Sequence, residues 1–142
     1  MEKPTLKDQL KKKILILDGA MGTMIQQADL TADDFGGEDL DGCNENLVLT
    51  RPDLIRSIHE AYLEAGSDII GTNTVGATRI VLAEYDLEDK VREINLAAAK
   101  LAVEAAAAFS TDQWPRYVAG ALGPTTKTLS VTGGATFDQL IE

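Results

Sequence analysis

The strongest constraint on the fold is an apolar run that ends in a carboxylate and closely spaced glycines. Residues 14–17 (ILIL) follow three lysines and lead directly into residues 18–22 (DGAMG). Four consecutive aliphatic residues predict a strand covered on both faces, as in a parallel α/β sheet. An unpaired carboxylate inside such a strand would be strongly unfavourable. We therefore expect Asp18 at the carboxyl end of the strand, facing a pocket.

The turn after Asp18 has two interpretations. Gly19 and Gly22 allow a tight turn whose backbone N–H groups point outward, which suits a bound carboxylate. Asp18 can meet an ammonium group there, so the segment offers both halves of an amino-acid site. The alternative is an ordinary turn, in which Asp18 caps the following helix and glycine supplies a positive φ. The turn residues alone do not separate the two.

Composition limits the classes of protein. The chain has 142 residues, 44% of them hydrophobic, which is enough for one substantial core. Its net charge of −10 opposes binding to nucleic acid or to an anionic membrane surface. No apolar stretch approaches the roughly 20 residues of a membrane-spanning helix. Cys43 is the only cysteine and no secretory signal pattern begins the sequence, so we expect a cytoplasmic protein without an internal disulfide.

Strand and helix patterns alternate along the chain. Thr50 is the predicted cap of a helix that starts at Pro52 and stops at Gly66. This alternation predicts a parallel sheet with right-handed crossovers, completed as a doubly wound sheet or as part of a (β/α)8 barrel. Besides residues 14–17, strands are predicted at 69–70 and 116–122, and further helices at 6–13, 23–27, 77–85, 86–109 and 136–142.

Polar residues after the second strand are further candidates, because ligands bind at the carboxyl ends of strands in both architectures. For Thr72 and Asn73, contact with a substrate and satisfaction of neighbouring backbone groups are equally open. His59 lies mid-helix beside the apolar stripe, and we expect it at the surface or its boundary without a catalytic role. Cys43 is expected to be a structural thiol, since a lone cysteine does not make a zinc site. Residues 18–23 lack the glycine register of a dinucleotide site.

Three sequence blocks carry a resemblance to a known family. They are residues 16–26 (ILDGAMGTMIQ), 42–70 (GCNENLVLTRPDLIRSIHEAYLEAGSDII) and 118–130 (VAGALGPTTKTLS). Together they resemble the homocysteine S-methyltransferase domain family, and within it the N-terminal region of cobalamin-dependent methionine synthases. The resemblance implies a (β/α)8 barrel. Residues 1–142 would form its N-terminal part, about three βα units, truncated at the C-terminus because such a barrel needs about 250 residues.

The resemblance also implies a chemistry. Homocysteine would bind beside a zinc ion held by three cysteine thiolates from later strands, and methylcobalamin would donate the methyl group. Asp18 would contact the homocysteine ammonium, and backbone N–H groups at Gly19, Ala20 and Met21 would hold its carboxylate. Thr72 and Asn73 would line the same site. We expect no catalytic residue and no zinc ligand in this chain, which is therefore predicted to be inactive by itself.

Two departures and two alternatives remain open. The family pattern favours Glu at Gly71 and Phe at Val75, so homocysteine contacts there are undecided. Betaine or S-methylmethionine could replace cobalamin as the methyl source. The chain could instead be a non-catalytic half-barrel that associates through its open strand edges. In a full-length relative the expected partners are homocysteine and a methyl-donor or cobalamin domain, with no nucleic acid and no membrane.

Overall fold

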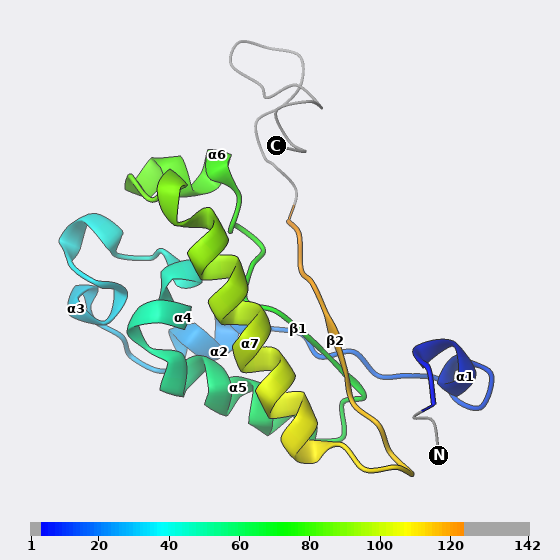
Figure 1. Cartoon of the computed structure of the whole chain (residues 1–142). Coiled ribbons are helices and arrows are strands. Elements are labelled where there is room, and N and C mark those ends of the chain that lie inside the picture. The colour runs from blue at the N-terminus through cyan, green and yellow to red at the C-terminus, as the bar shows by residue number, and fades with distance from the viewer. Residues whose placement is uncertain (1–3, 124–142) are drawn as a thin grey trace.

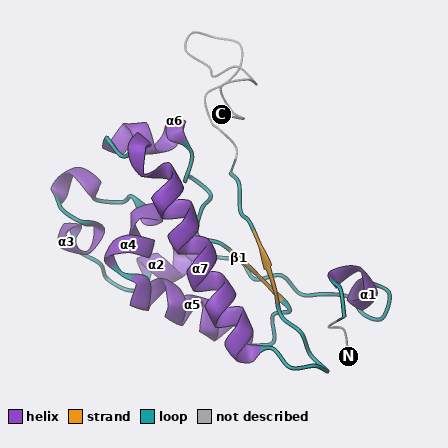
Figure 2. Ribbon diagram, in the orientation of Figure 1, coloured by secondary structure: helices purple, strands orange, loops and turns teal. Residues whose placement is uncertain are grey.

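The structure is a computed structural model that describes residues 4–123, and most of its regular structure is helical (Figure 2). The predicted helix at 136–142 lies outside the described residues. The α-helices are α1 (Leu6–Leu10), α2 (Met21–Gln26), α3 (Ala32–Phe35), α4 (Leu47–Thr50), α5 (Pro52–Glu64), α6 (Arg79–Leu82) and α7 (Val91–Phe109). Short 3-10 helices are η1 (Glu38–Leu40), η2 (Asn44–Asn46), η3 (Ala83–Tyr85) and η4 (Glu88–Lys90), and the strands are β1 (Ile69–Gly71) and β2 (Tyr117–Ala119).

The two strands pair in parallel, as the alternation of elements predicts. Ile69 lies opposite Tyr117 and Gly71 opposite Ala119. On the other side of β1, Leu17 makes a single parallel bridge to Ile69. The spatial order of residue 17, β1 and β2 therefore follows the sequence order. Parallel strands joined in sequence order by helices confirm an α/β arrangement.

The predicted strand at residues 14–17 is wrong in extent and in burial. Only Leu17 is bridged, and Ile14, Ile16 and Leu17 are 91%, 58% and 57% exposed. Figure 1 shows α4, α5 and α7 together on one side of the strands, with α1 set apart from them. Within residues 4–123, this segment has a neighbouring strand on the β1 side alone. The aliphatic run predicts a strand that is buried on both faces, but the described residues do not pack against both faces of this segment.

Helices α5 and α7 form the layer that packs on the strands. Buried Ile55 and Ile58 of α5 meet Ile94 and Ala98 of α7 in the main core cluster. A second cluster joins the end of α5 to β1 through Leu63, Ile70, Ala102, Ala105 and Ala106. Although α7 is 19 residues long and rich in alanine, no helix in the described part has the length and hydropathy needed to cross a bilayer.

The boundaries of α5 follow the sequence signals in part. Pro52 occupies the first helical position, and Gly66 ends the helix with a φ of 108°. The predicted cap at Thr50 is wrong. The Thr50 hydroxyl donates to the carbonyl of Asn46 at 3.3 Å, because residues 47–50 form the separate helix α4, and Arg51 takes the cap position.

His59 is fully buried, which corrects the predicted surface or boundary position. Its side chain is 0% exposed, and neither ring nitrogen has a hydrogen-bond partner among the described residues. Position 59 follows Ile55 by one helical turn, so it falls within the apolar stripe of α5. Burial lowers the pKa of His59 and favours the neutral ring. The absence of a catalytic role for His59 stays a prediction.

A carboxylate network closes the amino ends of the strands. Asp68, just before β1, accepts hydrogen bonds from Lys13 Nζ at 2.5 Å, Trp114 Nε1 at 2.6 Å and the Ile16 N–H at 3.0 Å. Burial raises the pKa of Asp68, but these bonds outweigh it and hold the pKa below its ordinary value. The Arg116 guanidinium lies 3.6 Å from the centre of the Trp114 ring. The network joins the segments that precede all three parallel strand positions.

Candidate functional site

A cavity of about 300 Å³ opens at the carboxyl ends of the strands, where the sequence predicts a site. Of the described side chains that line it, only that of Asp18 is titratable, and most of the rest are small or apolar. The lining residues are Leu17, Asp18, Gly19, Ala20, Met21, Gly71, Thr72, Val75, Ala119, Gly120 and Ala121. The cavity therefore brings together five of the six predicted site residues.

Asp18 is a partly buried acid without a cationic partner among the described residues. Its Oδ1 accepts a hydrogen bond from the Gly71 N–H at 2.8 Å. Burial raises the pKa of the Asp18 carboxyl, and the bond from Gly71 offsets only part of that effect. No Lys, Arg or His side chain in residues 4–123 forms a salt bridge with it. Such a carboxylate gains most from a cation brought by a ligand.

The turn after Asp18 differs from the second interpretation of the sequence. Ala20 is the cap residue of α2 with φ 46° and ψ 32°, whereas Gly19 has no positive φ. The alternative role of Asp18 as the cap of α2 is wrong, since no side chain caps this helix. Among the described residues, no acceptor takes the N–H groups of Gly19, Ala20 or Met21. The three residues that carry these N–H groups line the same cavity as Asp18.

Thr72 lines the cavity, but its hydroxyl is already engaged. Thr72 Oγ1 accepts from the Ala121 N–H at 3.0 Å and lies 2.6 Å from Thr74 Oγ1. Since Thr74 donates its own hydroxyl proton to the Ala121 carbonyl at 2.6 Å, Thr72 is the donor in the bond between the two threonines. These bonds tie the end of β1 to the residues after β2.

Asn73 does not line the cavity. It is buried, and its Nδ2 donates to the Asn44 carbonyl at 2.8 Å, which ties the chain after β1 to η2. Both Thr72 and Asn73 satisfy backbone groups, which is one of the two roles expected of them. Their contact with a substrate stays a prediction.

Sequence reasoning missed Glu45 and its contact with Gly76. Glu45 Oε1 accepts from the Gly76 N–H at 2.8 Å, and the neighbouring Val75 carbonyl accepts from the Gly123 N–H at 2.9 Å. Asn95 of α7 donates to the Ala77 carbonyl at 2.8 Å. No spacing or motif pairs Glu45 with a residue 31 positions later, so only the structure finds this contact.

The described residues do not fit the zinc implied by the resemblance. No group of three His, Cys, Asp or Glu side chains that could hold a metal ion occurs between residues 4 and 123. Cys43 is 0% exposed, and burial raises the pKa of its thiol. A cysteine binds zinc as the thiolate, which this environment disfavours. Cys43 instead packs in the main core cluster, as expected of a structural thiol.

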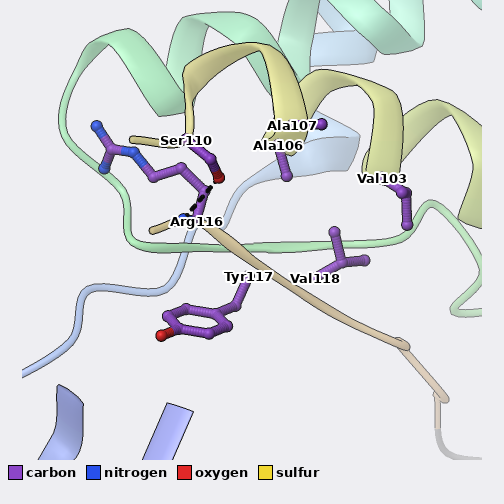
Figure 3. A pocket seen from close by; sticks show the side chains of 7 residues that line it. All are labelled: Val103, Ala106, Ala107, Ser110, Arg116, Tyr117 and Val118. Carbon is purple, nitrogen blue, oxygen red and sulfur yellow. Dashed lines mark hydrogen bonds between the residues drawn. The ribbon is translucent and has the colours of Figure 1, made fainter. Parts of the chain in front are cut away.

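A second cavity, of about 370 Å³, lies between α7 and β2 (Figure 3). Several of its polar groups are already engaged, although Arg116 Nε is buried without a hydrogen-bond partner among the described residues. The Ser110 hydroxyl accepts from the Arg116 N–H at 2.9 Å, Arg116 Nη1 donates to the Ser67 carbonyl, and the Tyr117 hydroxyl donates to the Pro4 carbonyl. Figure 3 shows the Arg116 side chain extending away from the apolar wall. The lining residues are Val103, Ala106, Ala107, Ser110, Arg116, Tyr117 and Val118.

Comparison with known proteins identifies the family of this chain. The sequence model described as homocysteine S-methyltransferase matches residues 15–142. The chain therefore belongs to the homocysteine S-methyltransferase family. It is 44% identical over 122 residues to the methionine synthases of Mycobacterium leprae (strain TN) and Mycobacterium tuberculosis (strain ATCC 25618 / H37Rv). Each alignment covers 86% of this chain and 10% of the relative.

Solved structures share the fold. The homocysteine methyltransferase MmuM from Escherichia coli, in its oxidized form, has a TM-score of 0.68 and 28% identity over 83% of this chain. Its metallated form has a TM-score of 0.68 and 27% identity over 84% of this chain. The aligned parts make up 40% and 41% of those chains. This chain thus spans a tenth of the length of the two methionine synthases and about two fifths of the solved structures. The resemblance seen in the sequence is confirmed.

Proposed function

We propose that this chain binds the amino-acid portion of homocysteine within a homocysteine S-methyltransferase. The observation that carries the proposal is Asp18, a partly buried acid with no cationic partner in residues 4–123. It shares one cavity with Gly19, Ala20 and Met21, whose N–H groups have no acceptor among the same residues. In this proposal Asp18 accepts from the α-ammonium group of homocysteine, and the N–H groups of Gly19, Ala20 and Met21 donate to its carboxylate. An ammonium beside Asp18 lowers the raised pKa, so binding and ionisation support each other.

The apolar part of the cavity suits the rest of the ligand. Val75, Ala119 and Ala121 line it with aliphatic groups, against which the two methylene groups of homocysteine would pack. Thr72 lines the same cavity. Because its hydroxyl is already hydrogen-bonded, it would contact the ligand only through the rest of its side chain and its backbone. Asn73 supports the site from behind by holding η2.

The wider assignment is part of the same proposal. Residues 1–142 would form the N-terminal part of a (β/α)8 barrel, about three βα units, supported by the strand order and by the TM-score of 0.68 over 83% of the chain. Zinc activation of the sulfur and methyl transfer from methylcobalamin, betaine or S-methylmethionine would depend on residues beyond the described ones, together with the corresponding donor or cobalamin domain. The isolated chain would then be inactive. The cytoplasmic location also stays a prediction.

Titration calorimetry with L-homocysteine under reducing conditions tests the binding proposal. The wild-type chain should show saturable binding with one site, and Asp18→Asn should weaken it at least about tenfold, because the ammonium loses its counter-ion. Asp33→Asn, at an exposed acid in α3, is the matched control.

A ligand series sharpens this test. The analogue 4-mercaptobutanoate lacks the ammonium group, so it should bind weakly and equally to wild type and Asp18→Asn. Equal homocysteine affinity in wild type and Asp18→Asn would overturn the proposal. Zinc-dependent methyl transfer by the isolated chain would overturn its predicted inactivity.

Association with another chain is a second candidate function. The observation in its favour is the exposed apolar surface of Ile14, Ile16, Leu17 and Leu122, the last of which is 79% exposed. In residues 4–123 the outer edges of the residue-17 segment and of β2 also have no pairing strand. Such edges and surfaces favour pairing with a complementary chain or a second copy. Sedimentation of the purified chain as a folded monomer across a wide concentration range would count against it.

A further inference from the structure

We propose that Glu45 is a positioning residue that fixes the segment 72–76, which contributes Thr72 and Val75 to the cavity wall. The proposal rests on the proposed function, because this is the wall against which homocysteine would lie. Glu45 itself does not line the cavity. It acts through Gly76 and Val75.

A side chain at position 76 would displace the Glu45 carboxylate. Glu45 Oε1 accepts the Gly76 N–H at 2.8 Å. A Cβ atom added to Gly76 would lie 2.8 Å from Oε1 and 3.0 Å from Cδ of Glu45. The carboxylate therefore lies directly against the backbone of residue 76. A backbone N–H bound to a charged acceptor forms a stronger hydrogen bond than one bound to a neutral acceptor.

Hydrogen bonding, more than burial, holds the wall at Val75. This side chain lines the cavity and is 54% exposed, so packing does little to fix it. Its carbonyl accepts the Gly123 N–H at 2.9 Å, and a Cβ added to Gly123 would lie 2.6 Å from that oxygen. Val75 thus lies between the bond from Gly76 to Glu45 and the bond to Gly123. Loss of the first bond should loosen the second.

The 3-10 helix η2 provides a rigid support for this wall. It is attached at two points, by Asn73 Nδ2 to the Asn44 carbonyl and by the Gly76 N–H to Glu45. The residues on either side of η2, Cys43 and Leu47, are both 0% exposed in the main core cluster. Because both ends of η2 are buried in the core, the wall is tied to a well-packed part of the molecule.

Amide hydrogen exchange, followed by NMR on the 142-residue chain, tests the proposal without a ligand. Glu45→Ala should speed exchange about tenfold or more at Gly76 and also at Gly123, although Glu45 does not contact Gly123. Glu45→Gln retains an acceptor oxygen and should restore at least part of the protection. Glu60→Ala, at a partly exposed acid of α5 that pairs with Arg56, is the control and should change neither amide. Faster exchange at Gly76 alone, or at neither residue, would overturn the proposal.

Homocysteine affinity distinguishes the failure of this inference from that of the proposed function. Glu45→Ala should raise the Kd about tenfold and Glu45→Gln should recover much of the affinity, while the melting temperature changes little. If Glu45→Ala does not fold, Glu45→Gln and Glu45→Asp take its place, and each should show a smaller change in both measurements. A wild-type chain that does not bind homocysteine would overturn the proposed function, and exchange at Gly123 would then decide the role of Glu45. Binding that depends on Asp18 but not on Glu45 would overturn this inference alone.

Discussion

Two aspartates at opposite ends of the same parallel strands have opposite environments. Asp68, at the amino ends, accepts three hydrogen bonds, one of them from Lys13, and its pKa is lowered. Asp18, at the carboxyl ends, accepts one bond from Gly71, and its pKa is raised by burial. A carboxylate whose acceptor positions are filled by the protein stabilises the fold. One whose positions are left open in an apolar cavity is available to a ligand.

Removal of the Asp68 carboxylate should have the largest effect on stability. Asp68→Ala strands the Trp114 Nε1–H and the Ile16 N–H without an acceptor and leaves Lys13 without its counter-ion. The free energy of unfolding should fall by about 2–3 kcal/mol. Urea unfolding at pH 7 measures it. A loss below about 0.5 kcal/mol would show that Asp68 is not the carboxylate that stabilises the fold.

The pH dependence should carry opposite signs at the two aspartates. Because the folded-state pKa of Asp68 is lowered, its stabilisation is present above the unfolded-state pKa of about 3.9 and is lost as pH falls through the folded value. Asp18 has a raised folded-state pKa, so its charge costs stability at neutral pH and acid removes that cost.

The free energies of unfolding of the wild type and of Asp68→Asn, measured from pH 7 to pH 2, check the sign at Asp68. His59 contributes to the acid response of the wild type, since burial lowers its pKa and protonation below about pH 6.5 costs stability. The wild type and Asp68→Asn share His59, so subtracting their unfolding free energies isolates Asp68. The difference should shrink as pH falls below about 4. A difference that is constant with pH would contradict the assignment.

Trp114→Phe should have an intermediate effect. It removes the bond from Trp114 Nε1 to Asp68 but retains an aromatic face for Arg116. The expected loss is about 1 kcal/mol, measured by thermal and urea unfolding followed by circular dichroism. Combined with Asp68→Ala, it should add little, because both changes break the same bond. Full additivity would mean that the two side chains act separately.

Asp18→Asn should have the smallest effect on stability. It removes a partly buried charge but can keep an oxygen acceptor for the Gly71 N–H, so unfolding at pH 7 should change by less than about 0.5 kcal/mol. The same variant should lose most of the homocysteine affinity. A loss of stability as large as that of Asp68→Ala would show that Asp18 supports the fold and is not reserved for a ligand.

Local patterns of apolar residues predicted much of the fold. The positions of α5 and α7 follow from apolar residues at helical spacing, and β1 and β2 follow from short apolar runs that end in small or polar residues. The exposure of residues 14–17 could not be predicted. An aliphatic run indicates that a strand should be buried, but not which other residues pack on its two faces. His59 was misplaced because polarity suggested a surface position while helical geometry placed it inside.

The candidate site was predictable at Asp18 and less so around it. The rule that strand ends bind ligands identified Asp18 and its turn as part of a cavity. Thr72 and Asn73 were ambiguous, because hydroxyl and amide groups serve substrates and backbone equally well. The bonds of Asp68 to Lys13 and Trp114 join residues 55 and 46 positions apart, and no local pattern encodes such long-range contacts.

The alanines of α7 have a consequence for the cavity. Helix α7 contacts the cluster containing Ile70 through Ala102, Ala105 and Ala106. Their methyl groups therefore set the distance between the helix and the strand there. A larger side chain at any of them would lift the helix and push the middle strand outward. That strand leads directly to Gly71 and Thr72, so the dimensions of the opening are also governed from the opposite side of the sheet.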